Sequence, residues 1–133
     1  MDRQHACRDI KDKMGSVPGF LNMLPDSTMG LEWELLKRVE MEPGQIPNKY
    51  RHLIGLGVAA ATRCKYCTVY HTEGARLNGA TEGEIEDAIH FAKSVMGWST
   101  YLHGMQYDFD KFKAEVAAIS ENATSRMPAP AEA

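Results

Sequence analysis

Apolar side chains recur at intervals of three and four residues along most of this chain, and this periodicity restricts its fold more than any other feature. Such spacing places the apolar residues on one face of an α-helix. No stretch has the sustained alternation of apolar and polar residues that a half-buried strand requires. We therefore expect an all-α fold with about six to seven helices.

Turn and cap residues divide the chain into these helices. A first helix is expected over residues 3–14, ending at Gly15, since glycine readily takes the left-handed conformation of a helix cap. Asp26 or Ser27 is expected to cap the helix that leads to Glu40. Further helices are expected from Pro47 onward, over 64–78, from the capping box Thr81–Glu84 to an end or interruption at Gly97, over Trp98–Met105, and from Asp108 or Asp110.

The length of 133 residues suits a single domain, which we place at residues 1–121 with its most distinctive part at 46–96. Residues 122–133 contain two prolines and several alanines and are expected to form a flexible tail. Helical proteins of this size often gain stability by associating with copies of themselves. An oligomer is therefore expected.

Charge and hydropathy narrow the classes of partner. The net charge is -3, and no run of Lys and Arg provides the basic surface of a nucleic-acid-binding protein. The longest mostly apolar stretch, residues 53–62, is about half the length of a membrane-spanning helix. The first residues also lack the order of a secretory signal. We expect a cytoplasmic protein.

The cysteines suggest chemistry rather than structural disulfides. There are three, so they cannot all pair within one chain, and Cys64 and Cys67 are separated by only two residues. In a reducing compartment, such a close pair indicates catalysis or metal binding. Cys7 stands alone near the N-terminus and is interpreted as a thiol without a catalytic role.

A histidine completes this motif. Cys64, Cys67 and His71 are spaced by three and four residues, which puts the three side chains on one helix face. If Cys64 begins the helix, unpaired N–H groups and the helix dipole favour its thiolate, the form that attacks peroxides and disulfides. The second thiol can resolve what the first begins, and His71 can move the proton. The motif predicts a redox-active dithiol.

Two other interpretations of the same residues remain. Cys64, Cys67 and His71 could bind zinc with a fourth ligand from His52, His90 or His103, although ligands along one helix differ from ordinary zinc modules. The three residues could also be structural. In the preceding helix, Gly55 and Gly57 cost about 1 kcal/mol each relative to alanine, which indicates that close packing or function requires them.

Residues 46–71, IPNKYRHLIGLGVAAATRCKYCTVYH, and the following EGARLNGAT at 73–81 resemble the carboxymuconolactone decarboxylase superfamily, specifically its AhpD-like alkylhydroperoxidase branch. The resemblance is good over residues 46–96. It implies an AhpD-like helical bundle that assembles into trimers or hexamers and needs no metal or organic cofactor. It also implies thiol-dependent reduction of hydroperoxides, with electrons supplied by a thiol–disulfide partner protein.

The resemblance carries over to the dithiol position by position. It implies that Cys67 attacks the peroxide and Cys64 resolves the sulfenic acid, whereas the helix dipole favours Cys64 as the more acidic thiol, so both orders stay open. The peroxidases carry a glutamate twelve residues before the first cysteine and a histidine between the cysteines, where this chain has His52 and Tyr66. We expect His52 to take over the role of the glutamate, which makes Cys64, Cys67, His71 and His52 the candidate catalytic residues.

The expected activity is therefore that of an alkylhydroperoxide reductase-like enzyme or a disulfide reductase. One alternative is a carboxymuconolactone decarboxylase-type lyase, which works through histidine and carboxylate groups without a dithiol. Another is a non-enzymatic oligomeric protein in which the dithiol senses redox state. The presence of the Cys64–Cys67 pair favours the oxidoreductase over the lyase.

Overall fold

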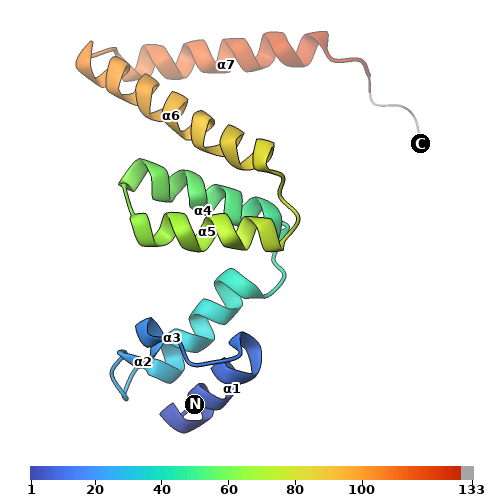
Figure 1. Ribbon diagram of the computed structural model, residues 1–133. Coiled ribbons are helices and arrows are strands. Elements are labelled where there is room, and N and C mark those ends of the chain that lie inside the picture. The colour runs from blue at the N-terminus through green and yellow to red at the C-terminus, as the bar shows by residue number, and fades with distance from the viewer. Residues whose placement is uncertain (130–133) are drawn as a thin grey trace. The chain divides into compact units, whose positions relative to one another are not determined.

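The computed structural model describes residues 1–129, and all its regular elements are helices (Figure 1). Over these residues there are seven α-helices and one short π-helix, η1, which confirms the all-α prediction. In chain order the elements are α1 (Arg3–Met14), α2 (Gly19–Asn22), α3 (Met29–Leu36), η1 (Lys37–Met41), α4 (Asn48–Thr62), α5 (Lys65–Leu77), α6 (Glu82–Gly104) and α7 (Phe109–Arg126). Among the described residues, no helix has both the length and the apolar character needed to cross a bilayer.

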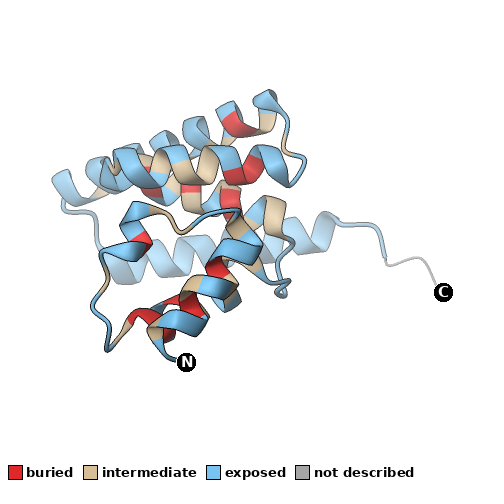
Figure 2. Ribbon diagram, turned by 60° about the horizontal axis from the view of Figure 1, so that its bottom comes forward, coloured by how far each residue is buried: buried red, intermediate tan, exposed pale blue. Residues whose placement is uncertain are grey.

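The contacts divide the chain into two compact units. The first spans Met1–Ala92, and the second begins at Lys93, within α6. The helix α7 continues to Arg126, so the segment expected to be a tail from residue 122 begins as helix, and residues 130–133 of that segment lie outside the described part. Buried residues concentrate in the first unit, and α7 has none (Figure 2). The candidate site therefore has to be sought in the first unit.

Several helix ends follow from local chemistry, as the sequence predicts. Gly15 caps α1 with a left-handed φ of 81°. The capping box forms, because Thr81 Oγ1 accepts from the N–H of Glu84 at 3.1 Å while Glu84 Oε2 accepts from the N–H of Thr81 at 2.9 Å. The Asp108 carboxylate caps α7 by accepting from the N–H of Lys111 at 2.6 Å.

Other ends differ from the predictions. The residue that precedes α3 is Thr28, not Asp26 or Ser27, and its side chain makes no capping hydrogen bond. Pro47 precedes α4 instead of occupying its first turn. The helix α6 runs through Gly97 to Gly104, so the prediction of a separate helix over Trp98–Met105 was wrong. One interior glycine costs only about 1 kcal/mol relative to alanine, which a long helix tolerates.

Two apolar clusters hold the first unit together. One joins α1, α2 and α3 through Ala6, Ile10, Leu21, Met29 and Trp33. The buried indole of Trp33 donates to Asp9 Oδ2 at 2.7 Å, so its polar N–H is satisfied. The other cluster consists of Leu56, Ala75 and Ile85 and joins α4, α5 and α6. This second cluster fixes α4 and α5 side by side, and these two helices carry the predicted dithiol motif and His52.

Candidate functional site

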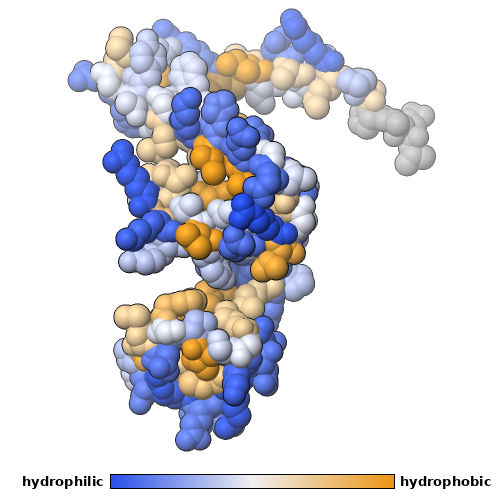
Figure 3. Space-filling view, viewed as in Figure 1, coloured by the Kyte–Doolittle hydropathy of each residue, from blue (hydrophilic) through white to orange (hydrophobic). Residues whose placement is uncertain are grey.

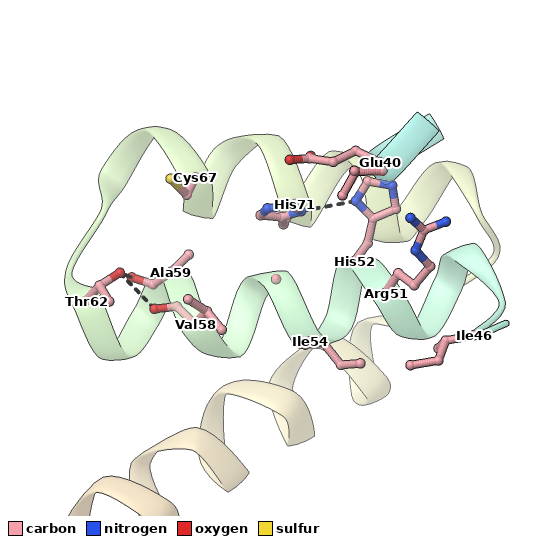
Figure 4. Close-up of a pocket in the computed structure, with 12 residues that line it drawn as sticks. Glu40, Ile46, Arg51, His52, Ile54, Val58, Ala59, Thr62, Cys67 and His71 are labelled. Carbon is pink, nitrogen blue, oxygen red and sulfur yellow. Dashed lines mark hydrogen bonds between the residues drawn. The ribbon is translucent and has the colours of Figure 1, made fainter. Parts of the chain in front are cut away.

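A cavity of about 430 Å³ lies in the first unit, along α4 and α5 (Figure 4). Most of its wall is apolar, and its polar or reactive groups are a cysteine sulfur, two imidazoles, one guanidinium, one carboxylate and one hydroxyl. The lining residues are Val39, Glu40, Ile46, Arg51, His52, Ile54, Gly55, Val58, Ala59, Thr62, Cys67 and His71. Three of the four predicted catalytic residues, Cys67, His71 and His52, thus meet in one cavity.

The turn between α4 and α5 places the dithiol. Arg63 takes a left-handed φ of 57°, its N–H donates to the carbonyl of Ala60 at 3.2 Å, and the N–H of Cys64 donates to the carbonyl of Ala59 at 2.9 Å. This pair of hydrogen bonds is a Schellman motif, and it ends α4 so sharply that Cys64 becomes the N-cap of α5. The prediction that Cys64 begins its helix is confirmed.

Cys64 and Cys67 form a disulfide, with their Cα atoms 5.3 Å apart. The sulfur of Cys64 also accepts from the backbone N–H of Cys67 at 3.2 Å, as an N-cap side chain does. Of the two, Cys67 lines the cavity, whereas Cys64 is not among the lining residues. The cysteines therefore differ in position: Cys67 faces the cavity, whereas Cys64 caps the N-terminus of α5.

The two histidines contact each other across the helix pair. Nδ1 of His52 on α4 lies 3.2 Å from Nδ1 of His71 on α5, within hydrogen-bond distance. Because one of two such nitrogens has to donate and the other accept, the pair holds a single proton between the rings. Figure 4 shows His71 between Cys67 and His52 along the cavity. In this arrangement, a proton can pass from a group in the cavity to His71 and from there to His52.

Each imidazole lies against a glycine of the opposite helix. A Cβ at Gly55 would come within 2.6 Å of Cε1 of His71, and a Cβ at Gly74 would come closer still to the ring of His52. Gly57 differs, since a Cβ there would make only an ordinary contact of 3.7 Å with Ala92. The expectation that close packing requires glycine is confirmed for Gly55. Sequence reasoning missed Gly74, although each histidine stands three residues before a glycine.

The surroundings keep His52 neutral. Burial is the main cause that lowers its pKa below the ordinary value, the electrostatic influence of the neighbouring His71 and then of Arg51 acts in the same direction, and the Glu40 carboxylate opposes them. His52 has only 8% of its surface exposed. For Tyr70 on α5, burial and then the nearby Glu40 carboxylate raise the pKa. At neutral pH, His52 can accept a proton and Tyr70 can donate a hydrogen bond.

Other residues considered from the sequence lie outside this arrangement. The described wall of the cavity includes neither His90 nor His103, and Tyr66, which stands between the cysteines, is 78% exposed. Within residues 1–129, no group of three or more His, Cys, Asp or Glu side chains is placed to hold a metal ion. Glu40 and Arg51 line the cavity but were not predicted, because no local motif marks them.

Comparison with known proteins agrees with this architecture. Residues 25–108 match the carboxymuconolactone decarboxylase family, which is more than half of the chain. A solved structure of an alkylhydroperoxidase AhpD core from Rhodospirillum rubrum is similar over 84% of this chain and 85% of that one, with a TM-score of 0.72 and 24% identity. This similarity confirms the AhpD-like helical fold.

A curated relative from Paracoccus denitrificans, "Uncharacterized protein 4 in cox locus", is 34% identical over 68 residues. That alignment covers 51% of this chain and 61% of the relative, so the chain spans about three-fifths of the relative's length. The family match, the shared fold and the Cys64–Cys67 pair confirm the resemblance found in the sequence. The chain belongs to the carboxymuconolactone decarboxylase family, with an AhpD-core-like fold.

Proposed function

We propose that this protein is a thiol-dependent oxidoreductase that reduces small hydroperoxides, or disulfides, through the Cys64–Cys67 dithiol. One observation carries the proposal: Cys67 faces the same cavity as the His52–His71 pair, and its disulfide partner Cys64 lies just outside. A nucleophile, a proton carrier and a resolving thiol are the groups that such a reaction needs.

The cycle balances with these groups and one external reductant. The Cys67 thiolate attacks the outer oxygen of a hydroperoxide, an S–O bond forms and the O–O bond breaks, so that sulfur loses the two electrons that the peroxide gains. The proton released by Cys67 returns to the leaving alkoxide, giving an alcohol and a sulfenic acid. The Cys64 thiol then attacks the Cys67 sulfur, water leaves, and the disulfide forms. A dithiol reductant restores both thiols by exchange.

The cavity supports Cys67 as the thiol that attacks first. Its sulfur faces the space where a substrate fits, whereas Cys64 caps the helix. The helix dipole still favours the thiolate of Cys64, but a thiolate attacks only a substrate that has access to it. We propose Cys67 as the attacking residue and Cys64 as the resolving one.

In this scheme, His71 takes the proton from Cys67, and His52 acts where the peroxidases use glutamate. The 3.2 Å contact between the two Nδ1 atoms supports this role for His52. A neutral imidazole is a proton acceptor, and the lowered pKa of His52 keeps it neutral near pH 7. The remaining wall, with Ile46, Ile54 and Val58, favours a substrate with an apolar organic group.

The proposal includes partners. Electrons have to come from a thiol–disulfide partner protein, and a reducing compartment, for which we propose the cytoplasm, would supply it. We also propose self-association, supported by hydrophobic residues at the surface of the second unit in Figure 3, and the family resemblance suggests a homotrimer or homohexamer. Large exposed side chains there include Trp98, Tyr101, Phe109 and Ile119. Light scattering gives the subunit number, and a monomer would contradict this part.

A turnover assay tests the proposed activity. The wild-type protein, supplied with cumene hydroperoxide and dithiothreitol, is expected to consume peroxide well above the protein-free background. The double variant Cys64→Ser/Cys67→Ser should fall to that background, because the alcohol side chains cannot be oxidised to a disulfide. Equal peroxide consumption by both proteins would refute dithiol chemistry.

A further inference from the structure

Glu40 is the one carboxylate among the described residues that line the cavity. It lies on η1, not on the helix pair that carries the cysteines and histidines, and its side chain is half-buried. Figure 4 shows the carboxylate of Glu40 reaching along His71 and His52. A negative charge therefore reaches the histidine pair from a third element.

The π-helix itself places this residue. The N–H of Glu42 donates to the carbonyl of Lys37 at 2.9 Å, an interval of five residues that widens the turn. Such turns are rare and occur frequently at functional sites. Val39 and Glu40 both lie within this π-helix, and both line the cavity.

The charges around His52 show what this carboxylate offsets. The groups that face His52 are Arg51 on its own helix, His71 and Tyr70 on α5, and Glu40 on η1. Arg51 is partly engaged elsewhere, since its Nη1 donates to the carbonyl of Glu42 at 2.7 Å and to Asn48 Oδ1 at 3.1 Å. Once the histidine pair accepts a proton, Glu40 is the one residue in the described wall of the cavity that provides an opposite charge.

We propose that Glu40 is the positioning residue of this site: its carboxylate, beside Tyr70, stabilises the protonated His52–His71 pair that forms when Cys67 releases its proton. This inference rests on the proposed thiol chemistry. It adds a negative charge that allows the two adjacent imidazoles to accept a proton together. It also supplies, from a different element, the carboxylate that is absent at position 52.

The proton balance follows directly. Cys67–SH and the neutral histidine pair become the Cys67 thiolate and a pair that carries one extra proton. After the thiolate attacks the peroxide, that proton passes to the leaving alkoxide, and the pair is neutral again. Glu40 touches neither sulfur nor peroxide and is unchanged at the end. Its charge lowers the free energy of the ion-pair state relative to the neutral one.

The test compares Glu40→Gln, which removes the charge and keeps the shape, with Glu40→Asp, which keeps the charge. Glu42→Gln is the matched control, because Glu42 is an exposed acid two residues away that does not line the cavity. The readout is the pH profile of iodoacetamide alkylation of Cys67 in the reduced proteins. Trypsin separates the cysteines, since it cuts after Arg63, Lys65 and Arg76.

Glu40→Gln is expected to shift the midpoint of Cys67 alkylation upward by about one pH unit, because the thiolate–imidazolium state loses its counter-charge. Glu40→Asp should recover part of that shift, and Glu42→Gln should match wild type. An NMR titration should show a lower pKa for His52 in Glu40→Gln, since Glu40 raises it. If Glu40→Gln gave the same alkylation profile as wild type, the inference about Glu40 would be overturned. Peroxide turnover by the wild-type protein would then still support the proposed function. A shifted profile in a protein without turnover would instead overturn only the proposed function.

Discussion

Cys67→Ser is expected to lower the rate of hydroperoxide consumption by at least about 1,000-fold, the scale on which enzymes lose rate without their nucleophile. The reason is positional: Cys67 is the cysteine whose side chain faces the cavity and the histidine pair. A serine hydroxyl at that place is not ionised near neutral pH and cannot carry the two-electron oxidation. Stopped-flow measurement of peroxide loss by the reduced protein checks the prediction.

Cys64→Ser is the matched control for this change. Without a resolving thiol, steady turnover should fall, but the first reaction with peroxide should keep a rate within about tenfold of wild type. A dimedone adduct, which marks sulfenic acid, should then appear on the tryptic fragment 66–76. An adduct on residues 64–65 of the Cys67→Ser protein would reverse the order and support the helix-dipole argument.

Gly55→Ala is expected to destabilise the first unit by about 1–3 kcal/mol, the usual cost of forcing extra volume into a packed interior. The added methyl would meet the His71 ring at 2.6 Å, so either the ring or α4 has to move. Either movement is expected to disturb the 3.2 Å contact between His71 and His52, so peroxide turnover should fall as well. Urea unfolding of the reduced proteins gives the change in free energy of unfolding.

Gly57→Ala provides the comparison on the same helix. Its new methyl would lie 3.7 Å from Ala92, an ordinary contact, and alanine favours helix by about 1 kcal/mol over glycine. We therefore expect this variant to be as stable as wild type or more stable, with unchanged activity. If Gly55→Ala proved as stable and active as Gly57→Ala, the reciprocal packing of histidine on glycine would have no importance for the site.

The sequence predicts those parts of the fold that depend on neighbours within a turn. Gly15 as a cap, the Thr81–Glu84 box and Asp108 before α7 all act within three or four residues. The same holds for Cys64 at the start of its helix. The extent of α6 was less predictable, because an interior Gly97 carries only a small cost and leaves the outcome to the rest of the helix.

The parts of the site that the sequence did not predict depend on tertiary contacts. Helical periodicity puts His52 on one face of α4, but only the packing of α5 brings His71 and Gly74 to it. Glu40 was harder to predict, because it lies on the π-helix η1 and no local sequence pattern in this chain marks that π-helix. A residue on a third element, twelve positions from His52, becomes part of the site only in the folded structure.

The mass of the protein before and after peroxide treatment tests the central claim most directly. One equivalent of cumene hydroperoxide, added to the reduced protein, is predicted to remove two hydrogens. Tryptic fragments 64–65 and 66–76 should then stay joined until a reductant is added, because only the disulfide connects them after cleavage at Lys65. A gain of oxygen without loss of hydrogen, or fragments that separate before reduction, would contradict a redox-active Cys64–Cys67 pair.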